Sequence, residues 1–599
     1  KGEFMTDYQI KETYKNWMSR PLPADLKAEL ESIAGDSEAV SDRFYRDLAF
    51  GTGGLRGVIG AGTNRMNIYT VGKATQGYAD YLREQTAVEG SPAVEESPSV
   101  EESLSGEGLP SVVIAYDSRI KSEEFARRAA EVFAANGIRV HIYPELMPTP
   151  SLSFAIRHLG CDGGVVITAS HNPAKYNGYK VYGPDGCQIT TEAAKAIQGR
   201  IGALDLFEDV KRVDFDRAMK EGRISWVGED VVDAYIRAVS TQRFCEDDEI
   251  DKNVSITYTP LNGAGLKCVL RALRENGFSN IHVVPEQEKP DGHFPTCPYP
   301  NPEIREAMEL GIQYAKKNGS DLLLATDPDC DRVGIAVRDD RGEYVLLTGN
   351  EVGLLLFEYI CRRRIACGRM PENPVLMKTI VTIDHVKKIA DRYGVQVIDV
   401  LTGFKFIGEQ IGLLEKKGEL DRYIFGFEES YGYLSGTFVR DKDGVNASLL
   451  ICEMFAYYKT QGKGLLEVLN DLYDRYGYCL NTQHSCQLEG AAGFERMQQI
   501  MSRLRQAPPK EAAGRKVVSV EDYQTQEKRF SDGGMEVIQG LPRSNVLKFW
   551  LEGGCSFVVR PSGTEPKLKL YFSVSGEGRE QVGELEQQLS AELMKYLGI

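Results

Sequence analysis

The sequence predicts an α/β protein: three consecutive α/β domains with mixed, doubly covered sheets, then a smaller α+β domain, around a central cleft. The 599 residues exceed what one hydrophobic core can serve, since single cores stop growing at about 250–300 residues. Between residues 111 and 427, apolar strand patterns alternate with amphipathic helix patterns, which indicates sheets with helices on both faces. The last part of the chain gives isolated strands and one terminal helix instead.

The elements are expected in the following order. Helical spacing covers roughly the first forty residues and then 68–83. The strands that follow are continuous apolar runs, as in strands buried on both faces. Expected strands are 111–116, 138–143, 163–168, 254–259, 280–284, 321–325, 375–378, 395–400, 422–427, 546–551, 556–559 and 568–574, with helices at 123–136, 150–159 and from Arg579. The domains are then expected at 1–212, 213–342, 343–474 and 475–599.

The composition argues against several classes of protein. A formal charge of −16 argues against a nucleic-acid or anionic-membrane surface. No apolar run approaches the ~18 residues of a membrane span. Twelve scattered cysteines without a CxxC pair indicate reduced thiols, so we expect a cytoplasmic protein. The segment 87–110 is acidic and rich in serine and proline, which predicts a solvated, flexible insertion.

Four polar segments follow expected strands, where ligands bind in open α/β sheets. The first, 168–173, reads Thr-Ala-Ser-His-Asn-Pro and places Ser170 and His171 at the end of the strand 163–168. A polar turn would explain a lone Ser-His-Asn as well. An acyl-transfer nucleophile is a further interpretation, but the sequence has no GxSxG motif.

The second segment, 326–332, crowds Asp327, Asp329 and Asp331 into one loop. Their mutual repulsion needs a cation to offset it. Oxygen-only ligands favour Mg²⁺ or Mn²⁺ over zinc. The EF-hand pattern is absent, and the alternative is a solvated acidic turn.

The third segment, 426–432, contains Glu428 and Ser430, which suit hydrogen bonds to sugar hydroxyls. A surface turn is equally compatible with it. The cationic residues Arg440 and Lys442 lie shortly after it.

The fourth segment, 560–567, combines a cation, two hydroxyls and a glycine: Arg560, Ser562, Gly563 and Thr564. These groups could hold a phosphate, and an ordinary hairpin turn is the alternative. The glycines at 263 and 265 lack the third glycine of a dinucleotide loop, so we interpret them as a strand-to-helix turn. No Walker motif is present.

Taken together, the four segments resemble the α-D-phosphohexomutase superfamily, in its bacterial phosphoglucomutase and phosphopentomutase-like branch. The resemblance extends from Phe50 to Tyr571 and includes 50–57 (FGTGGLRG), 63–67 (TNRMN), 291–295 (DGHFP) and 300–303 (PNPE). It implies that Ser170 is phosphorylated and that Asp327, Asp329 and Asp331 bind one Mg²⁺ together with the serine phosphate.

The resemblance also implies roles for the remaining candidates. Lys180 is the first choice for the general base, with a pKa lowered by neighbouring cations such as Arg56, while His171 orients or binds. The stretch 402–406 (TGFKF) resembles one that carries an active-site lysine, here Lys405. The remaining substrate-binding residues are expected to be Arg332, Glu428, Ser430, Arg440, Lys442, Arg560, Ser562, Gly563 and Thr564.

Three departures concern the choice of sugar. Phe427 stands where the family commonly has glycine, Tyr431 replaces a phenylalanine, and the insertion is not part of the family pattern. The pair Glu428-Glu429 followed by Ser430 favours glucose over mannose.

The resemblance implies interconversion of glucose 1-phosphate and glucose 6-phosphate through phosphoserine and a glucose 1,6-bisphosphate intermediate. The alternatives are the same chemistry on a pentose or on mannose, synthesis of the bisphosphate, a metal-dependent sugar phosphatase, or a non-catalytic sensor. We expect small sugar phosphates as partners, no nucleic acid or membrane, and a monomer or weak homodimer.

Overall fold

The computed structural model describes residues 5–51, 53–88, 108–246, 249–488, 490–562 and 567–599. The chain forms two compact units. Unit 1 comprises Lys1–Leu347, Gly408–Leu420 and Gly432–Tyr457, and unit 2 comprises Thr348–Ile407, Asp421–Tyr431 and Tyr458–Ile599. The helices α15 (Phe404–Lys416) and α16 (Gly444–Thr460) each carry the chain from one unit into the other.

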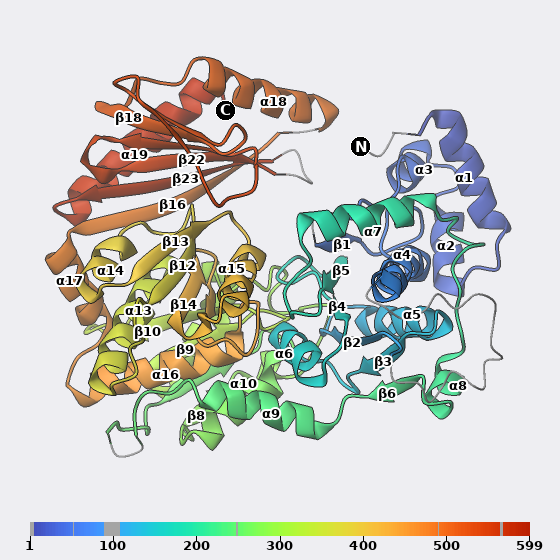
Figure 1. Ribbon diagram of the computed structural model, residues 1–599, viewed down its shortest axis with the longest axis horizontal. Helices are drawn as coiled ribbons and strands as arrows, with labels where there is room; N and C mark the ends of the chain where they lie inside the picture. Colours follow the sequence, from blue (N-terminus) through green and yellow to red (C-terminus); the bar gives the residue numbers. More distant parts are fainter. Residues whose placement is uncertain (1–4, 52, 89–107, 247–248, 489, 563–566) are drawn as a thin grey trace. The chain divides into compact units, whose positions relative to one another are not determined.

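Unit 1 begins with a sheet in the order β1-β5-β4-β2-β3-β6 (Figure 1). The pairs β4-β2, β2-β3 and β3-β6 are parallel, and β1-β5 and β5-β4 are antiparallel. Its elements are α1 (Asp7–Ser19), α2 (Ala24–Ser32), α3 (Ser37–Phe44), β1 (Gly54–Val58), α4 (Ile68–Val88), β2 (Ser111–Tyr116), α5 (Ser122–Ala135), β3 (Arg139–Ile142), α6 (Thr149–Leu159), β4 (Gly163–Ile167), β5 (Tyr176–Tyr182), α7 (Thr191–Ala203), α8 (Phe215–Lys220), β6 (Ile224–Trp226) and α9 (Glu229–Ser240).

Both faces of this first sheet are covered. Val112, Ile114 and Ile167 belong to the same apolar cluster as residues of α4 and α5. On the other face, Gly164 lies so close to Ile156 of α6 that a Cβ would meet its side chain at 2.7 Å. This burial on both faces explains why the strands are continuous apolar runs.

The second sheet of unit 1 has the order β11-β10-β9-β7-β8. The strands β7, β8 and β9 are parallel, and β10 and β11 add an antiparallel edge. Helix α12 packs Met308 and Ile312 against Leu323 of β9. The elements are β7 (Ile256–Thr259), α10 (Gly265–Glu275), β8 (Ile281–Val283), α11 (Pro285–Glu288), α12 (Arg305–Asn318), β9 (Leu322–Thr326), β10 (Val333–Arg338) and β11 (Tyr344–Leu347). Unit 1 also contains β15 (Gly432–Leu434), which is not part of this sheet.

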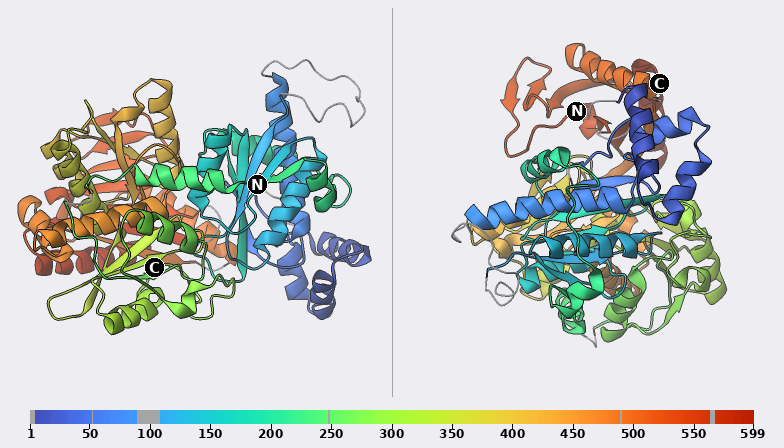
Figure 2. Two further views of the ribbon diagram at one scale, coloured as in Figure 1. Left: turned by 90° about the horizontal axis from the view of Figure 1, so that it is seen from below. Right: turned by 90° about the vertical axis from the view of Figure 1, so that its right-hand side faces the viewer.

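Unit 2 starts with the parallel strands β13-β12-β14. A second, antiparallel sheet follows in the order β16-β23-β22-β21-β18-β19-β20, with α18 and α19 packed against it (Figures 1 and 2). The elements are α13 (Gly349–Ala366), β12 (Val375–Thr379), α14 (Val386–Tyr393), β13 (Gln396–Val400), β14 (Tyr423–Glu428), α17 (Leu465–Tyr476), β16 (Tyr478–Gln487), α18 (Gly490–Gln506), β17 (Glu511–Ala512), β18 (Arg515–Asp522), β19 (Glu527–Phe530), β20 (Met535–Val537), β21 (Leu547–Leu551), β22 (Ser556–Pro561), β23 (Lys567–Gly576) and α19 (Arg579–Leu597).

The expected fold class is confirmed, and the expected strands agree with the structure to within a few residues at each end. The antiparallel strands β1, β5, β10 and β11, and the strands β6, β15 and β16–β20, were not expected. The structure contains mixed sheets because β1, β5, β10 and β11 are antiparallel. Within the expected insertion, Ala87 and Val88 still belong to α4, while 89–107 lie outside the described residues.

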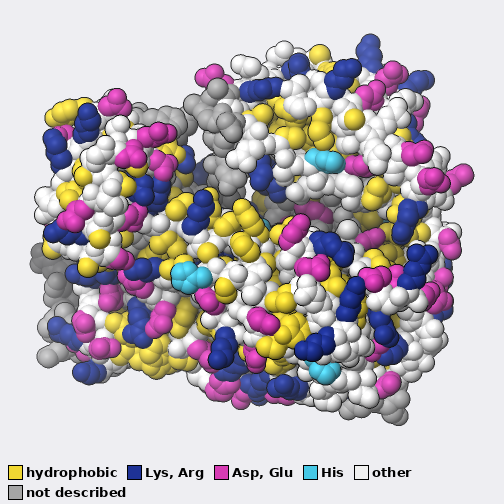
Figure 3. Space-filling view, turned by 180° about the vertical axis from the view of Figure 1, so that it is seen from behind, with side chains coloured by type: hydrophobic (Ala, Val, Ile, Leu, Met, Phe, Trp, Pro, Cys, Tyr) yellow, Lys and Arg dark blue, Asp and Glu magenta, His cyan; other side chains and the backbone are white. Residues whose placement is uncertain are grey.

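The surface gives no broad region of one charge on the face drawn in Figure 3, where basic and acidic side chains are intermingled. Among the described helices, none has both the length and the apolar character needed to cross a bilayer.

His385 is a buried histidine of unit 2. Its imidazole is 4% exposed and lies beside Tyr473 and Tyr476, with ring centroids 6.4 and 6.3 Å away. Neither ring nitrogen hydrogen-bonds to a described residue. Burial, with a smaller effect of the Lys388 charge, lowers the pKa of His385 to about 4.

We predict that replacing His385 with phenylalanine removes part of the acid sensitivity of unit 2. The unfolded chain protonates this imidazole near pH 6.5, so the folded form loses stability as the pH falls from about 6.5 toward 4. Between pH 7 and 4.5 this loss is about 2–3 kcal/mol. Urea unfolding of wild type and His385→Phe at both pH values measures it. Equal losses in the two proteins would show that His385 is protonated in the folded state too.

Candidate active site

Ser170 lies in the loop that follows β4, residues 168–173, called here the Ser170 loop. Its backbone takes a left-handed conformation, with φ of 54°, and its side chain is buried. The hydroxyl donates a hydrogen bond to Oδ2 of Asp327 over 2.9 Å, and Nδ1 of His171 lies 3.2 Å from the same oxygen. Two segments that are 157 residues apart in the chain therefore meet at this hydroxyl.

The aspartate loop, residues 326–332, follows the buried strand β9. Asp327, Asp329 and Asp331 are at most 1% exposed, and one carboxylate oxygen from each lies within 4.8 Å of the others. The Oδ1 atoms of Asp329 and Asp331 have no hydrogen-bond partner among the described residues. Oxygen ligands that are this close and incompletely satisfied fit a hard divalent cation such as Mg²⁺.

The pKa values of Asp327 and Asp329 are shifted in opposite directions. Burial, together with the charges of Asp329 and Asp331, raises the pKa of Asp327 well above its usual range. Burial would also raise the pKa of Asp329, but the charge and hydrogen bond of Lys180 lower it below its usual range. Without a cation at these oxygens, protonation of Asp327 would reduce the excess negative charge of the site.

Two lysines supply positive charge to the aspartate loop. Nζ of Lys180, from β5, lies 2.8 Å from Asp329 and 3.6 Å from Asp331. Nζ of Lys442 lies 3.1 Å from Asp331 and 3.2 Å from Asp441. Each lysine thus connects two segments through carboxylates that are buried with it.

The expected lowering of the pKa of Lys180 is wrong for this arrangement. Burial does favour the neutral amine, but the carboxylates of Asp329 and Asp331 outweigh it, and the pKa is raised. This balance could not be predicted from the sequence, because Lys180 on β5 and the aspartates after β9 belong to different sheets and come together only in the folded chain.

Two arginines act on His171. Burial, then the positive charges of Arg332 and Arg56, lower the pKa of His171 well below its usual value, so the imidazole is neutral at pH 7. Arg56 lies on the exposed side of β1, where it pairs in register with Gly178 of β5. Arg332 forms an ion pair with Glu303, in the expected stretch 300–303.

Arg440 has a packing role in the structure. Its side chain is fully buried, its guanidinium lies 3.0 Å from Glu415, and its backbone N–H donates to Oγ of Ser153 over 2.9 Å. Its expected contact with substrate remains a prediction.

Unit 2 carries the expected sugar-binding residues. Glu428 is buried at the end of β14, and its Oε1 accepts a hydrogen bond of 2.9 Å from the backbone N–H of Gly403. Thr379 and Thr382 donate to Glu429 over 3.3 and 3.2 Å. Ser430 follows directly, and Lys405 lies on α15 with its amine 5.1 Å from the centroid of Phe406.

Phe427 is buried against Gly353 of α13, which accounts for an aromatic side chain where the family commonly has glycine.

The segment that is expected to bind phosphate lies between β22 and β23. Arg560 is in β22, and the N–H of Ser562 donates to the carbonyl of Lys567 over 2.7 Å. Gly563 and Thr564 lie outside the described residues.

Two residues of this region were missed from the sequence. Asp117 and Arg119 follow β2 and are buried, and Arg119 donates hydrogen bonds to backbone carbonyls of the Ser170 loop. Their position after an expected strand was the available signal, since β2 neighbours β4 in the sheet.

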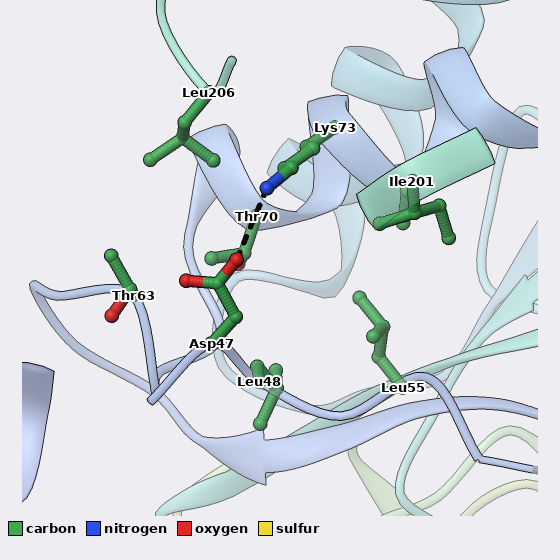
Figure 4. Close-up of a pocket in the computed structure, with 9 residues that line it drawn as sticks. Asp47, Leu48, Leu55, Thr63, Thr70, Lys73, Ile201 and Leu206 are labelled. Carbon is green, nitrogen blue, oxygen red and sulfur yellow. Dashed lines mark hydrogen bonds and ion pairs between the residues drawn. The ribbon is translucent and has the colours of Figure 1, made fainter. Parts of the chain in front are cut away.

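The pocket drawn in Figure 4 lies elsewhere in unit 1. It has a volume of about 50 Å³ and is lined mainly by apolar side chains such as Leu48, Leu55 and Ile201. An ion pair of 3.1 Å joins Lys73 to Asp47 across it. It contains none of the expected site residues.

Family models match most of the chain. Four models describe domains of phosphoglucomutase/phosphomannomutase: α/β/α domain I matches 99–207, domain II 233–342, domain III 348–476 and the C-terminal domain 504–591.

Curated relatives extend the match over nearly the full length. A phosphoglucomutase from Staphylococcus haemolyticus is 35% identical over 545 residues, which is 90% of this chain and 93% of the relative. A phosphoglucomutase from Staphylococcus aureus strain USA300 is 36% identical over 533 residues, covering 89% and 90%.

Solved structures share the fold. A phosphoglucomutase/phosphomannomutase family protein from Burkholderia thailandensis has a TM-score of 0.62 at 18% identity and covers 91% of this chain and 97% of that one. The open form of the phosphoprotein pp63/parafusin from Paramecium has a TM-score of 0.63 at 17% identity and covers 91% and 93%.

We predict that the substitution Asp329→Asn weakens Mg²⁺ binding at least about 10-fold, because it removes one charged ligand from a set of three. Isothermal titration measures the affinity. Asp340→Asn is the matched control, since Asp340 is an exposed aspartate in the same part of the chain. Equal Mg²⁺ affinities for wild type and Asp329→Asn would contradict the metal assignment.

Proposed function

The chain belongs to the phosphoglucomutase/phosphomannomutase family, and on that premise we propose that it interconverts glucose 1-phosphate and glucose 6-phosphate through a phosphorylated Ser170. The observation that carries this proposal is the hydrogen bond of 2.9 Å from the Ser170 hydroxyl to Asp327 within a cluster of three aspartates. A hydroxyl beside such a cluster can accept a phosphoryl group, because a cation held by the aspartates would offset the negative charge of the phosphate. The name shared by the curated relatives supports glucose as the sugar.

The transfer has two halves. A hydroxyl oxygen of the sugar phosphate attacks the phosphorus on Ser170, the bond from phosphorus to Oγ breaks, and the product is glucose 1,6-bisphosphate. After the bisphosphate has reoriented, Oγ of Ser170 attacks the phosphorus of its other phosphoryl group. The bond from that phosphorus to the sugar oxygen breaks, the sugar oxygen takes up a proton, and the sugar monophosphate leaves while Ser170 is phosphorylated again. Catalysis then depends on positioning and charge neutralisation more than on covalent steps.

The aspartates would hold a divalent cation, for which Mg²⁺ is our assignment from the oxygen-only donor set. Bound there, a cation supplies a Lewis acid that neutralises charge on the phosphoryl oxygens. Asp327 faces Ser170 directly, while Asp329 and Asp331 also hold Lys180.

Lys180 and His171 would carry the proton. The raised pKa keeps Lys180 protonated, so it can donate a proton to the oxygen of Ser170 as that oxygen leaves phosphorus. Lys180 can accept a proton only after its ion pairs with Asp329 and Asp331 have weakened, because these ion pairs raise its pKa. Because the Ser170 hydroxyl donates to Asp327, the neutral His171 can orient it by donating its Nδ1–H to the same oxygen.

Binding of the sugar phosphate would use unit 2. Glu428 and Ser430 would bind sugar hydroxyls, Lys405 and Arg560 would supply positive charge, and Ser562, Gly563 and Thr564 would bind the phosphate that is not reacting. Arg56, Arg332 and Lys442 would supply positive charge beside Ser170 and the aspartate loop. Glucose 1,6-bisphosphate would act as both intermediate and activator.

Mannose phosphate is a second candidate substrate, because the matching family models also describe phosphomannomutases. Comparing kcat/KM for glucose 1-phosphate, mannose 1-phosphate and ribose 1-phosphate tests the sugar. Measuring released inorganic phosphate in the same assays separates a mutase from a sugar phosphatase.

We predict that Ser170→Ala lowers kcat by at least about 1000-fold, because the phosphoryl carrier is lost. Ser225→Ala is the control, since Ser225 is a partly buried serine of β6 in the same sheet. Intact-mass analysis of wild type should show a form heavier by about 80 Da, one phosphoryl group, that increases with glucose 1,6-bisphosphate. Wild-type activity in Ser170→Ala, or phosphate on His171, would refute the mechanism.

A further inference from the structure

Ser170 has a backbone conformation that a serine rarely adopts. Its φ of 54° lies in the left-handed region, which non-glycine residues occupy only when their surroundings hold them there. The direction of the side chain depends on this conformation, and here it leads to Asp327. Some group must therefore hold the backbone of the Ser170 loop.

The guanidinium of Arg119 is fully buried against this backbone. Nε donates to the carbonyl of Ser170 over 3.2 Å, and one terminal nitrogen donates to the carbonyls of Pro173 and Tyr176 over 3.0 and 3.1 Å. The other terminal nitrogen donates to the carbonyls of Ser170 and Asn172. All five N–H groups of the arginine are thus used on one short stretch of backbone.

Asp117 connects Arg119 to the amide of Ser170. Its carboxylate lies 3.4 Å from Nε of Arg119 and accepts a hydrogen bond of 2.6 Å from the hydroxyl of Thr168. That hydroxyl in turn accepts a hydrogen bond of 2.8 Å from the N–H of Ser170. The backbone N–H and C=O of Ser170 are therefore both fixed from the end of β2.

The stretch 291–295 closes over Arg119. The guanidinium carbon lies 5.1 Å from the centroid of Phe294, and Gly292 forms an isolated β-bridge with Arg119. A Cβ on Gly292 would lie 2.4 Å from the backbone nitrogen of Ile120, so a side chain there would collide with backbone. These contacts give a physical reason for Gly292 and Phe294 in the stretch 291–295, which no step of the proposed reaction uses.

We propose that Arg119, supported by Asp117 and Thr168, is a positioning residue that holds Ser170 in the left-handed conformation needed to direct its Oγ at Asp327. The proposal rests on the proposed function, because it concerns the residue that would be phosphorylated. Lysine could not replace arginine, since three donors on one nitrogen cannot reach carbonyls that are arranged around a planar guanidinium.

Arg119 also contributes charge. Burial lowers the pKa of Arg119, but the charges of Asp117, Asp329 and Asp327 favour its charged form. A fixed positive charge at the Ser170 backbone offsets part of the charge that phosphorylation adds, about −1.5 to −2. Positioning and charge would both favour the phosphorylated loop.

The test compares Arg119→Lys with Arg128→Met in the full chain. We expect Arg119→Lys to lower kcat about 100-fold while KM for glucose 1-phosphate stays within about 3-fold, because a displaced Ser170 affects transfer more than sugar binding. Arg128→Met, which removes a partly buried arginine of α5 that pairs with Glu131, should keep wild-type kcat and KM. The ³¹P NMR resonance of the phosphoserine should shift or broaden in Arg119→Lys and stay unchanged in Arg128→Met.

A milder pair of variants decides the outcome if Arg119→Lys does not fold. Thr168→Val keeps the shape of the side chain but removes the hydroxyl between Asp117 and Ser170, and we expect about a 10-fold fall in kcat. Thr168→Ser restores the hydroxyl and should recover most of the activity.

Two results would overturn the proposal. One is a folded Arg119→Lys with wild-type kcat and an unchanged ³¹P resonance, and the other is wild-type activity in Thr168→Val. A wild-type protein without mutase activity would instead refute the proposed function, so the two failures are distinguishable.

Discussion

The repulsion among three buried aspartates is the constraint on which the rest of the site depends. Asp327, Asp329 and Asp331 are removed from water on one short loop, and their charges are too close to coexist without cations nearby. Lys180 and Lys442 meet this need from β5 and from the segment after β15, and Arg119 adds charge from the end of β2. The same attraction brings these segments to Ser170. A loop built to tolerate concentrated charge is also a loop that can accept a phosphoryl group.

Unit 2 also contains paired buried charges, and there they connect two sheets. Lys378 is fully buried between Asp384 and Asp399, at 3.0 and 2.8 Å, and Lys548 of β21 reaches Asp384 over 2.7 Å. Because Lys548 belongs to the antiparallel sheet and Asp384 precedes α14, this cluster connects the two sheets of unit 2. Breaking one partner of such a buried group costs more than the pair contributes. The expected sugar-binding and phosphate-binding segments are therefore carried on sheets that are tied together.

The sequence was most informative where a strand is buried on both faces. Strands such as β2, β4 and β9 read as continuous apolar runs, so their ends, and hence Ser170 and the aspartates, could be located. The strands β1, β5, β10 and β11 were missed because their residues are polar, glycine-containing or only partly buried. The raised pKa of Lys180 and the contacts of Arg119 depend on distances between segments that are far apart in the sequence, which one-dimensional patterns do not contain. Arg119 in particular was indistinguishable from a surface arginine after a strand.

The central claim is that the three aspartates bind a metal ion in contact with a phosphate on Ser170. Electron–nuclear double resonance of the phosphorylated protein loaded with Mn²⁺, a cation that suits the same oxygen ligands, tests it most directly. The account predicts one bound Mn²⁺ per chain with hyperfine coupling to ³¹P. Bound Mn²⁺ that shows no coupling to ³¹P in the phosphorylated protein would contradict it.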